Sequence, residues 1–209
     1  MNIQRFPLGE LWTNCYILWD DNKKGIIVDP GGSAEYVADF VTENKIDVAY
    51  IMLTHGHADH IGGIPDVRKL SKYGVAIHTD DACCLTNPDK NLSFAFGKAF
   101  SLPEAEKLLT DGEIVTVGNL KIEVIHTPGH TPGGVCFYVE DGADKILLCG
   151  DTLFELSIGR TDLPGGDEAV LINSLRKLER FPDDLEACPG HGPATNIGKE
   201  KKYNPYWPR

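Results

Sequence analysis

The chain has 209 residues, and its 20 Lys and Arg against 31 Asp and Glu give a formal net charge of −11. With 42% hydrophobic and 24% charged residues it has the composition of a globular protein that buries an ordinary core, which excludes a largely disordered chain. The acidic balance also argues against non-specific binding to nucleic acid or to an anionic membrane, because both reward Lys and Arg patches.

The first part of the chain is predicted to alternate strands with helices. Residues 14–20 and 25–32 have the apolar character of strands, and the polar stretch between them is typical of a hairpin turn. Residues 33–45 predict an amphipathic helix with Ser33 as its N-cap. An apolar strand over residues 48–54 then leads into a histidine-rich segment.

After this segment the same order repeats. We expect a helix over residues 64–74, a strand over 75–80 and a short helix over 80–86. Residues 87–111 contain proline and three phenylalanines without clear periodicity, so we expect a surface excursion there, with helix near Pro103–Leu109.

The second half of the chain is predicted to be rich in strands. The expected elements are strands at 113–117, 120–125, 134–139, 145–148 and 185–190, and an amphipathic helix over 167–181 with Asp167 near its start. Strands interleaved with helices in both halves indicate an α/β fold. We expect residues 1–209 to form a single domain in which two sheets pack face to face with helices outside, an αβ/βα sandwich.

Two further features bear on the cellular context. The N-terminal residues show no basic stretch followed by an apolar run, and no apolar run approaches the roughly 18 residues of a membrane span. The six cysteines show no C-x-x-C spacing and mostly lie in apolar runs, which is typical of buried, reduced thiols. We therefore expect a cytoplasmic protein, and the sequence leaves its oligomeric state open.

The histidine-rich segment H-G-H-A-D-H, residues 55–60, offers four potential metal ligands in six residues at the end of a buried strand. In an extended stretch His55 and His57 project to the same side, whereas Asp59 and His60 lie on the turn that enters the next helix. This geometry can serve two neighbouring metals rather than one. A histidine-rich, solvated turn is the alternative.

Three further strand ends run into turns of small residues that contain a ligand-type side chain: His130, Asp151 and His191. Each alone would be typical of a cap or turn residue, but their recurrence after apolar strands favours one shared site. Imidazole and carboxylate groups without thiolate suit zinc, and manganese or iron are also compatible. Of the remaining histidines, we expect His78 to be structural and His126 to support the ligands from behind or to pack in the core.

The T-H-x-H-x-D-H signature, followed in order by His130, Asp151 and His191, resembles the metallo-β-lactamase-fold hydrolases, and within them the short glyoxalase II-like (hydroxyacylglutathione hydrolase-like) branch. Asp29 in VDPGG, the GDTLF segment, GRTD at residues 159–162 and a C-terminal Asn-Pro extend the resemblance over nearly the whole chain. The resemblance implies the four-layer αβ/βα sandwich of that family.

The resemblance also implies a cofactor of two divalent metal ions, most simply zinc. The implied ligands are His55, His57 and His130 for one metal, Asp59, His60 and His191 for the other, and Asp151 as a bridge between the two. Asp29 would then be a buried carboxylate that supports the loop rather than a ligand.

Two divalent cations a few ångströms apart can share a water and lower its pKa toward neutrality, and the hydroxide so formed would attack a carbonyl carbon. A thioester suits such a site because its thiolate leaves readily. The carboxylates of Asp59 and Asp151 only partly neutralise two divalent metals, so the pocket should be locally positive and favour anionic substrates. Together with this chemistry, the resemblance implies a metal-dependent thioesterase acting on hydroxyacyl thioesters such as S-D-lactoylglutathione, with a small-molecule substrate as its partner.

Arg160 matches the position at which, by the same resemblance, glyoxalase II enzymes carry a basic residue that binds a glutathione carboxylate; an exposed surface Arg is the alternative. Only 18 residues follow His191, so we expect no helical substrate domain of the kind that the longer enzymes carry. The C-terminal tail carries basic and aromatic side chains that either lie beside the pocket or are solvated: Lys199, Lys201, Lys202, Tyr203, Tyr206 and Trp207.

The alternative function belongs to another reaction class. Persulfide dioxygenases share this fold and a GRTD-like segment, and there a single iron held by His55 or His57 together with His130 and Asp151 would oxidise glutathione persulfide. The hydrolase is favoured because a short chain with GRTDLPGGD resembles the small glyoxalase II-like proteins. A β-lactamase is not expected, because those enzymes are usually exported, and a non-catalytic binding protein is disfavoured because every ligand position is kept.

Overall fold

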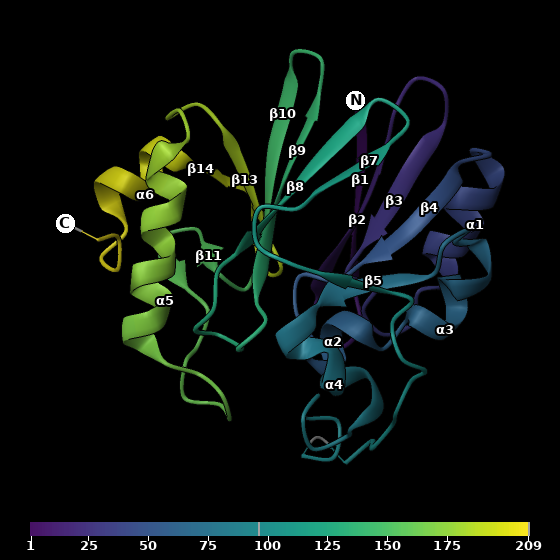
Figure 1. Cartoon of the computed structure of the whole chain (residues 1–209), viewed down its shortest axis with the longest axis horizontal. Coiled ribbons are helices and arrows are strands. Elements are labelled where there is room, and N and C mark those ends of the chain that lie inside the picture. The colour runs from purple at the N-terminus through teal and green to yellow at the C-terminus, as the bar shows by residue number, and fades with distance from the viewer. Residues whose placement is uncertain (96, 209) are drawn as a thin grey trace.

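The computed structural model describes residues 1–95 and 97–208, and two six-stranded sheets form its centre (Figure 1). The first sheet has the spatial order β1 (Asn2–Leu8), β2 (Thr13–Trp19), β3 (Lys24–Val28), β4 (Asp47–Met52), β5 (Val75–His78) and β6 (Lys107–Leu109). Its first three strands are antiparallel, and β3 to β6 are parallel to one another.

The second sheet is formed by the C-terminal half of the chain. Its spatial order is β14 (Thr195–Asn196), β13 (Glu186–Pro189), β10 (Asp144–Gly150), β9 (Val135–Asp141), β8 (Leu120–His126) and β7 (Ile114–Val117). Only the β10–β13 pair is parallel. A small hairpin of β11 (Leu153–Phe154) and β12 (Ser157–Ile158) follows β10.

Helices lie on the outer face of each sheet (Figure 1). The α-helices are α1 (Glu35–Glu43), α2 (Ala58–Ile61), α3 (Ile64–Val67) and α4 (Ala82–Thr86) beside the first sheet, and α5 (Glu168–Leu175) and α6 (Ile197–Tyr203) beside the second. Short 3-10 helices occupy Arg68–Leu70, Thr79–Asp81 and Arg176–Arg180.

Three separate apolar cores define four layers. The central core joins the two sheets and includes Leu18 of β2 and Phe137 of β9. The alternate residues of the same strands point outward, because side chains alternate along a strand. Ile17 of β2 therefore joins the core under α1 and α3, and Cys136 of β9 joins the core under α5 and α6. The expected α/β fold, a four-layer αβ/βα sandwich, is confirmed.

The N-terminus of α1 corrects one expectation from the sequence. Ser33 does not cap this helix: its φ is +59°, a left-handed backbone conformation, and the N-cap residue is Ala34. The backbone N–H of Ala34 donates instead to Asp66 Oδ2 of α3, at 2.9 Å. A carboxylate from the next helix thus takes the place of the local hydroxyl.

The segment after α4 corrects a second expectation. Residues 107–109, expected to be helical as part of Pro103–Leu109, form β6, and this strand pairs with β5 at the edge of the first sheet. Residue 96 of the expected excursion lies outside the described residues. The helices expected over 64–74 and 167–181 are shorter, because each continues as a 3-10 helix after one or two turns.

The two sheets are tied together where their strands end. The backbone N–H of Val135, at the start of β9, donates to Thr54 O after β4 at 2.8 Å. Nearby, Asn14 N donates to Gly190 O at 2.7 Å, and the Tyr16 hydroxyl donates to Pro189 O at 2.8 Å. These bonds bring the loops that follow β4, β8 and β13 to one edge of the sandwich.

The six cysteines are free thiols, and all but Cys83 are buried. Within the part of the chain that the structure describes, no helix combines the length and the apolar character that crossing a bilayer requires.

Candidate metal centre

The H-G-H-A-D-H segment connects the buried strand β4 to α2. His57 is the extended N-cap residue of α2 (φ −70°, ψ 149°), so the chain turns from strand-like to helical geometry directly after it. Asp59 and His60 consequently lie in the first turn of the helix, offset from His55 and His57 as the sequence predicted. His55 and His60 are almost completely buried, whereas Asp59 is partly exposed.

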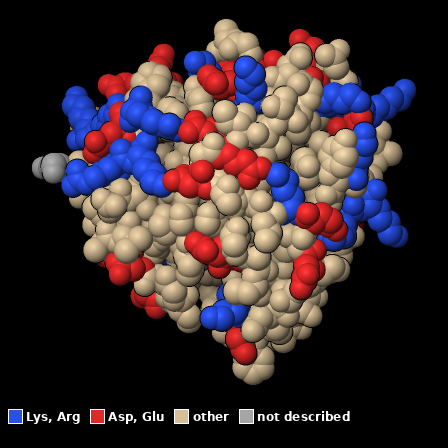
Figure 2. Space-filling model, viewed as in Figure 1, with Lys and Arg blue, Asp and Glu red and all other residues tan. Residues whose placement is uncertain are grey.

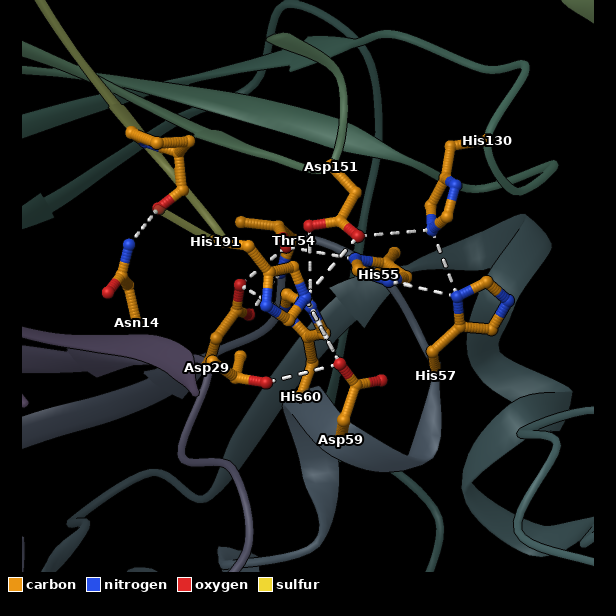
Figure 3. Close-up of polar contacts among 12 residues, drawn as sticks. Asn14, Asp29, Thr54, His55, His57, Asp59, His60, His130, Asp151 and His191 are labelled. Carbon is orange, nitrogen blue, oxygen red and sulfur yellow. Dashed lines mark hydrogen bonds and ion pairs between the residues drawn. The ribbon is translucent and has the colours of Figure 1, made fainter. Parts of the chain in front are cut away.

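A first group of imidazole nitrogens converges between the two sheets. His55 Nε2 lies 3.1 Å from His57 Nδ1, and His57 Nδ1 lies 3.0 Å from Nε2 of His130 in the β8–β9 loop (Figure 3). Two nitrogen ligands of a tetrahedral zinc, each about 2.0–2.1 Å from the metal, are about 3.3–3.4 Å apart. The spacing of these three nitrogens is close to that of a shared coordination sphere.

A second group lies beside the first. His60 Nε2 is 3.3 Å from His191 Nε2, and His191 Nε2 is 3.2 Å from Asp59 Oδ2. Asp151, at the end of β10, lies between the groups: Oδ2 is 3.5 Å from His130 Nε2, and Oδ1 is 3.4 Å from His60 Nε2 (Figure 3). The structure thus brings together all seven residues for which the sequence predicted a common site.

The outer nitrogens of these imidazoles are held by oxygen atoms. His60 Nδ1 contacts Asp29 Oδ2 at 2.9 Å, His130 Nδ1 contacts Arg160 O at 2.7 Å, and His191 Nδ1 contacts Leu11 O at 3.0 Å. Because a carbonyl or carboxylate can only accept, each outer nitrogen carries the proton and leaves the inner lone pair free. The donor set therefore fits divalent cations.

The carboxylate of Asp151 tests independently whether these residues suit a bound cation. Its Oδ1 atom is buried and, among the described residues, accepts no hydrogen bond. A buried carboxylate oxygen without a partner is costly unless a cation or a donor satisfies it. Gly190 keeps the space beside this oxygen open, because a Cβ built on Gly190 would come within 2.3 Å of it.

Burial and mutual repulsion keep several of the groups in their ligand forms. Burial lowers the pKa of His57 to about 3, and the neighbouring His130 adds to the effect. Burial would raise the pKa of Asp59 and of Asp151, but the imidazole of His60 and its neighbours outweigh it and lower both. Neutral His57 and ionised carboxylates are the species that bind metals. The pKa of His191 is raised, because the nearby carboxylates of Asp59 and Asp151 outweigh its burial.

Asp29 is buried directly behind the site. It has a left-handed backbone conformation (φ +50°), and its carboxylate accepts from Thr54 N at 2.8 Å and from Thr54 Oγ1 at 2.6 Å, besides contacting His60. The hydroxyl of Thr54 in turn lies 3.2 Å from His55 Nδ1. One carboxylate thus connects to an imidazole of each group.

Asp81 is a buried residue that the sequence analysis did not single out. Its carboxylate accepts from Gly56 N at 3.0 Å, from Gly133 N at 2.6 Å and from Thr131 Oγ1 at 2.8 Å. It therefore joins the loop of His55 and His57 to the loop of His130. The only signal in the sequence was its place just after β5, where an acidic residue is also typical of a helix start.

The site opens into a cavity of about 380 Å³, which we call the metal cavity, lined by Leu11, Leu92, Phe154 and Arg160 besides the candidate ligands. The guanidinium of Arg160 makes two hydrogen bonds of 2.7 Å to the carboxylate of Asp162. Arg160 thus lines the cavity in which the sequence analysis expected it to bind a substrate carboxylate. In this structure its guanidinium is hydrogen-bonded to Asp162 instead.

The C-terminal tail lies elsewhere. None of the described residues that line the metal cavity comes from this segment. Trp207 is buried against the second sheet, and Lys199 and Lys201 pair with Glu155 and Asp183. The tail therefore packs on the outer side of the second sheet and contributes no side chain to the described lining of the metal cavity.

A third group of ligand-type residues consists of His78, Asp80 and His126, and the sequence analysis did not assign its histidines to metal binding. The two imidazole rings stack on one another, with centroids 4.0 Å apart and an angle of 13° between their planes. Imidazole lone pairs lie in the ring plane, so stacked rings aim them in parallel rather than at one point. His126 Nε2 also lies 2.8 Å from Pro132 O, a contact that requires a proton on this nitrogen. These three residues are thus poorly arranged to hold a metal.

On the face that Figure 2 shows, acidic and basic side chains are interspersed around large uncharged areas.

Comparisons with known proteins extend these observations. A family model described as the metallo-beta-lactamase superfamily matches residues 8–191. The chain is 37% identical to hydroxyacylglutathione hydrolase GloC of Haemophilus influenzae, over 99% of this chain and 98% of that protein. Of the solved structures, the BLEG-1 B3 metallo-beta-lactamase matches with a TM-score of 0.91 at 38% identity, covering 98% and 99% of the two chains. TTHA1623 in a di-iron-bound form matches with a TM-score of 0.85 at 33% identity, covering 97% and 99%.

Proposed function

The chain belongs to the metallo-β-lactamase superfamily, and from that premise we propose that it is a binuclear metal-dependent thioesterase that hydrolyses hydroxyacyl thioesters such as S-D-lactoylglutathione. The observation that carries the proposal is the position of Asp151, whose two carboxylate oxygens face two adjacent groups of ligand atoms. The similarity to a hydroxyacylglutathione hydrolase over almost the full length supports the choice of substrate.

In this proposal His55, His57 and His130 hold one metal, Asp59, His60 and His191 hold the other, and Asp151 contributes to both. Bound divalent metals supply Lewis acidity, which lowers the pKa of a coordinated water and polarises the substrate carbonyl. Zinc suits a set of imidazoles and carboxylates without thiolate.

The chain's own residues position the reaction. Thr13 Oγ1 donates to Asp59 Oδ2 at 3.1 Å and fixes the orientation of that carboxylate. Leu11, Phe154 and Ile158 line the metal cavity and limit the access of bulk water to the thioester. Arg160 at the same cavity offers a planar fork for a substrate carboxylate once Asp162 releases it.

A second candidate function is the oxidation of a persulfide at an iron centre. The match to TTHA1623 in a di-iron-bound form favours iron as the competing metal, since the imidazole and carboxylate donors accept it as well. Iron held by His55 or His57 with His130 and Asp151 would be sufficient for this chemistry.

The experiment that tests the proposal is a substrate panel on zinc-loaded protein, with metal content measured before and after loading. We expect hydrolysis of S-D-lactoylglutathione, loss of that activity in Asp151→Ala, and full activity in Asp21→Ala, an exposed carboxylate away from the site. If the protein instead contains one iron per chain and consumes oxygen when glutathione persulfide is added, the thioesterase proposal fails and the dioxygenase function is supported. A β-lactam belongs in the panel because of the match to BLEG-1, and its hydrolysis in place of the thioester would overturn the proposal.

A further inference from the structure

A second cavity lies directly beside the metal cavity. It has a volume of about 360 Å³ and is lined by the loop after β1, by the turn before α1, by α2 and by the segment after α4. Leu11 and Asp59 line both cavities, so the two spaces adjoin at these residues. We call this space the side cavity.

The side cavity offers little to a charged or polar group. Among the described residues that line it, the charged ones besides Asp59 are Glu10 and Lys98, which pair with each other at 2.8 Å. The hydroxyl of Ser93 is engaged by the backbone N–H and C=O of Phe100, at 3.1 and 3.3 Å. The hydroxyl of Ser33 also lines this space, and the other lining groups are glycine backbone and apolar side chains such as those of Leu8, Leu11 and Phe100.

The two cavities therefore differ in the chemistry that they accept. The metal cavity contains Arg160 and suits the anionic thiol portion of a thioester. In the side cavity, Lys98 is the cation among the described lining residues, and it is paired with Glu10. A thioester whose carbonyl lies at the metal centre has two arms. The charged arm matches the metal cavity, and an apolar arm matches the side cavity.

We propose that the side cavity binds the acyl chain of the substrate, and that the protein prefers thioesters whose acyl group carries an apolar chain of about six to eight carbons. This inference rests on the proposed thioesterase function. The reaction remains a hydrolysis: water adds to the thioester carbonyl, the C–S bond breaks, and a carboxylate, a thiol and one proton are released. Each methylene that becomes buried should raise kcat/KM about fourfold until the cavity is full.

Gly32 offers a direct way to fill the side cavity. It lines this space, and a Cβ built on it would meet only Gly9 Cα, at 3.9 Å, which is an ordinary contact. Its neighbour Gly31 has no such freedom, because a Cβ there would come within 2.6 Å of Asp59 O. The substitution Gly32→Leu should therefore add bulk inside the side cavity without disturbing the metal ligands.

The experiment compares butanoyl, hexanoyl and octanoyl thioesters of glutathione on zinc-loaded protein, together with calorimetric binding of butanoate, hexanoate and octanoate. In the wild type we expect octanoyl to exceed butanoyl about 100-fold or more in kcat/KM, and octanoate to bind correspondingly tighter than butanoate. Gly32→Leu should reduce both ratios at least tenfold. Ala143→Leu adds the same side chain at an exposed turn between β9 and β10 and should leave both ratios unchanged.

The outcomes separate this inference from the proposed function. If lactoyl and butanoyl thioesters are hydrolysed but chain length has no effect on hydrolysis or binding, the side cavity does not hold the acyl chain and the thioesterase function stands. If no thioester is hydrolysed, the proposed function fails, and the substrate inference fails with it even where octanoate binds. If the wild type prefers the longer chain but Gly32→Leu leaves the octanoyl-to-butanoyl ratios of kcat/KM and of affinity unchanged, the acyl chain binds elsewhere and the inference is overturned.

Discussion

Asp81 shows how a residue without contact to the metal centre can govern its geometry. Its carboxylate holds two backbone N–H groups and one hydroxyl, from loops that belong to different sheets. Removing a buried acceptor leaves its donors unsatisfied, at about 1–3 kcal/mol each. The loops of His55, His57 and His130 are then free to separate.

We therefore predict that Asp81→Ala lowers the free energy of unfolding by about 2–5 kcal/mol and weakens zinc binding by about 10- to 100-fold. Denaturant titration and a competitive zinc chelator would measure the two effects. Asp80→Ala, at the exposed neighbouring position, is the matched control and should change zinc affinity little. Equal zinc affinity in wild type and Asp81→Ala would contradict the positioning role.

Arg160 and Asp162 form an exposed pair at the rim of the metal cavity. If Arg160 binds the substrate carboxylate, Arg160→Ala should raise KM for an anionic thioester about tenfold with little change in kcat. Asp162→Ala should act in the opposite direction and lower KM, since it releases the guanidinium. Steady-state kinetics distinguish the two, and Arg176→Ala serves as the control for loss of a surface charge. If Arg160→Ala leaves the KM for the anionic thioester unchanged, Arg160 does not bind the substrate carboxylate.

At the scale of elements, α1 depends on α3 for its N-terminus. The backbone N–H of Ala34 donates to Asp66, whereas Ser33 has left-handed backbone geometry. Loss of a side-chain cap costs about 1 kcal/mol. We predict that Asp66→Ala lowers the free energy of unfolding by about 1 kcal/mol and that Ser33→Ala loses no capping bond. A larger loss in Ser33→Ala than in Asp66→Ala, measured by urea unfolding, would contradict this account and identify Ser33 as the cap.

The turn between β2 and β3 is joined to the turn between β7 and β8 by Asp20. This buried carboxylate accepts from Asn22 N, Lys24 N and Asn119 N, each at 2.9 Å, and Gly118 leaves room for it. Burial would raise the pKa of Asp20, but the three backbone donors outweigh it and lower the pKa below its usual value.

The sign of the resulting pH dependence follows from that direction. A lowered pKa in the folded state means that the ionised carboxylate stabilises the fold above the unfolded pKa of about 3.9, and that this contribution is lost as pH falls through the lower folded pKa. We predict that Asp20→Asn is less stable than wild type by about 1–3 kcal/mol at pH 7. The difference should shrink below about pH 4. A constant difference from pH 7 to pH 3 in thermal unfolding would contradict this account.

At the scale of the whole molecule, the candidate ligands come from both sheets. His55, His57, Asp59 and His60 follow β4, whereas His130, Asp151 and His191 follow β8, β10 and β13. A metal bound by both halves would therefore stabilise the folded sandwich over the unfolded chain. The stabilisation amounts to about 2.7 kcal/mol at a free metal concentration 100 times the Kd.

We predict that chelation lowers the melting temperature by several degrees, and that Tm rises again with added zinc in a concentration-dependent way. Asp151→Ala should abolish most of this zinc-dependent shift, because Asp151 faces both groups of ligands. Calorimetric scans with and without chelator measure the effect. A Tm that does not respond to zinc would argue against a metal shared between the sheets.

Much of this protein could be predicted from its sequence, because the decisive signals were local. Alternation and apolar runs depend on neighbouring residues, so the main strands, the α/β class and the start of α5 near Asp167 were predictable. In the structure the side chain of Asp167 caps this helix and accepts from Val170 N at 3.0 Å. The set of seven candidate ligands was also visible, because each follows a buried strand and has a chemically distinctive side chain.

The tertiary structure alone decided the features that depend on contacts distant in sequence. Asp66 reaches Ala34 across 32 positions, Asp81 reaches Gly133 across 52, and residues 107–109 become a strand because β5 offers them an edge. The side cavity exists only because Leu11, Asp59 and Phe100 meet there. Sequence by itself thus determined the fold class and the chemistry of the candidate site. The positions of the ligands, the access to them and the shape of the cavities were decided by long-range packing, because the energies of contacts between distant residues do not appear in any local sequence pattern.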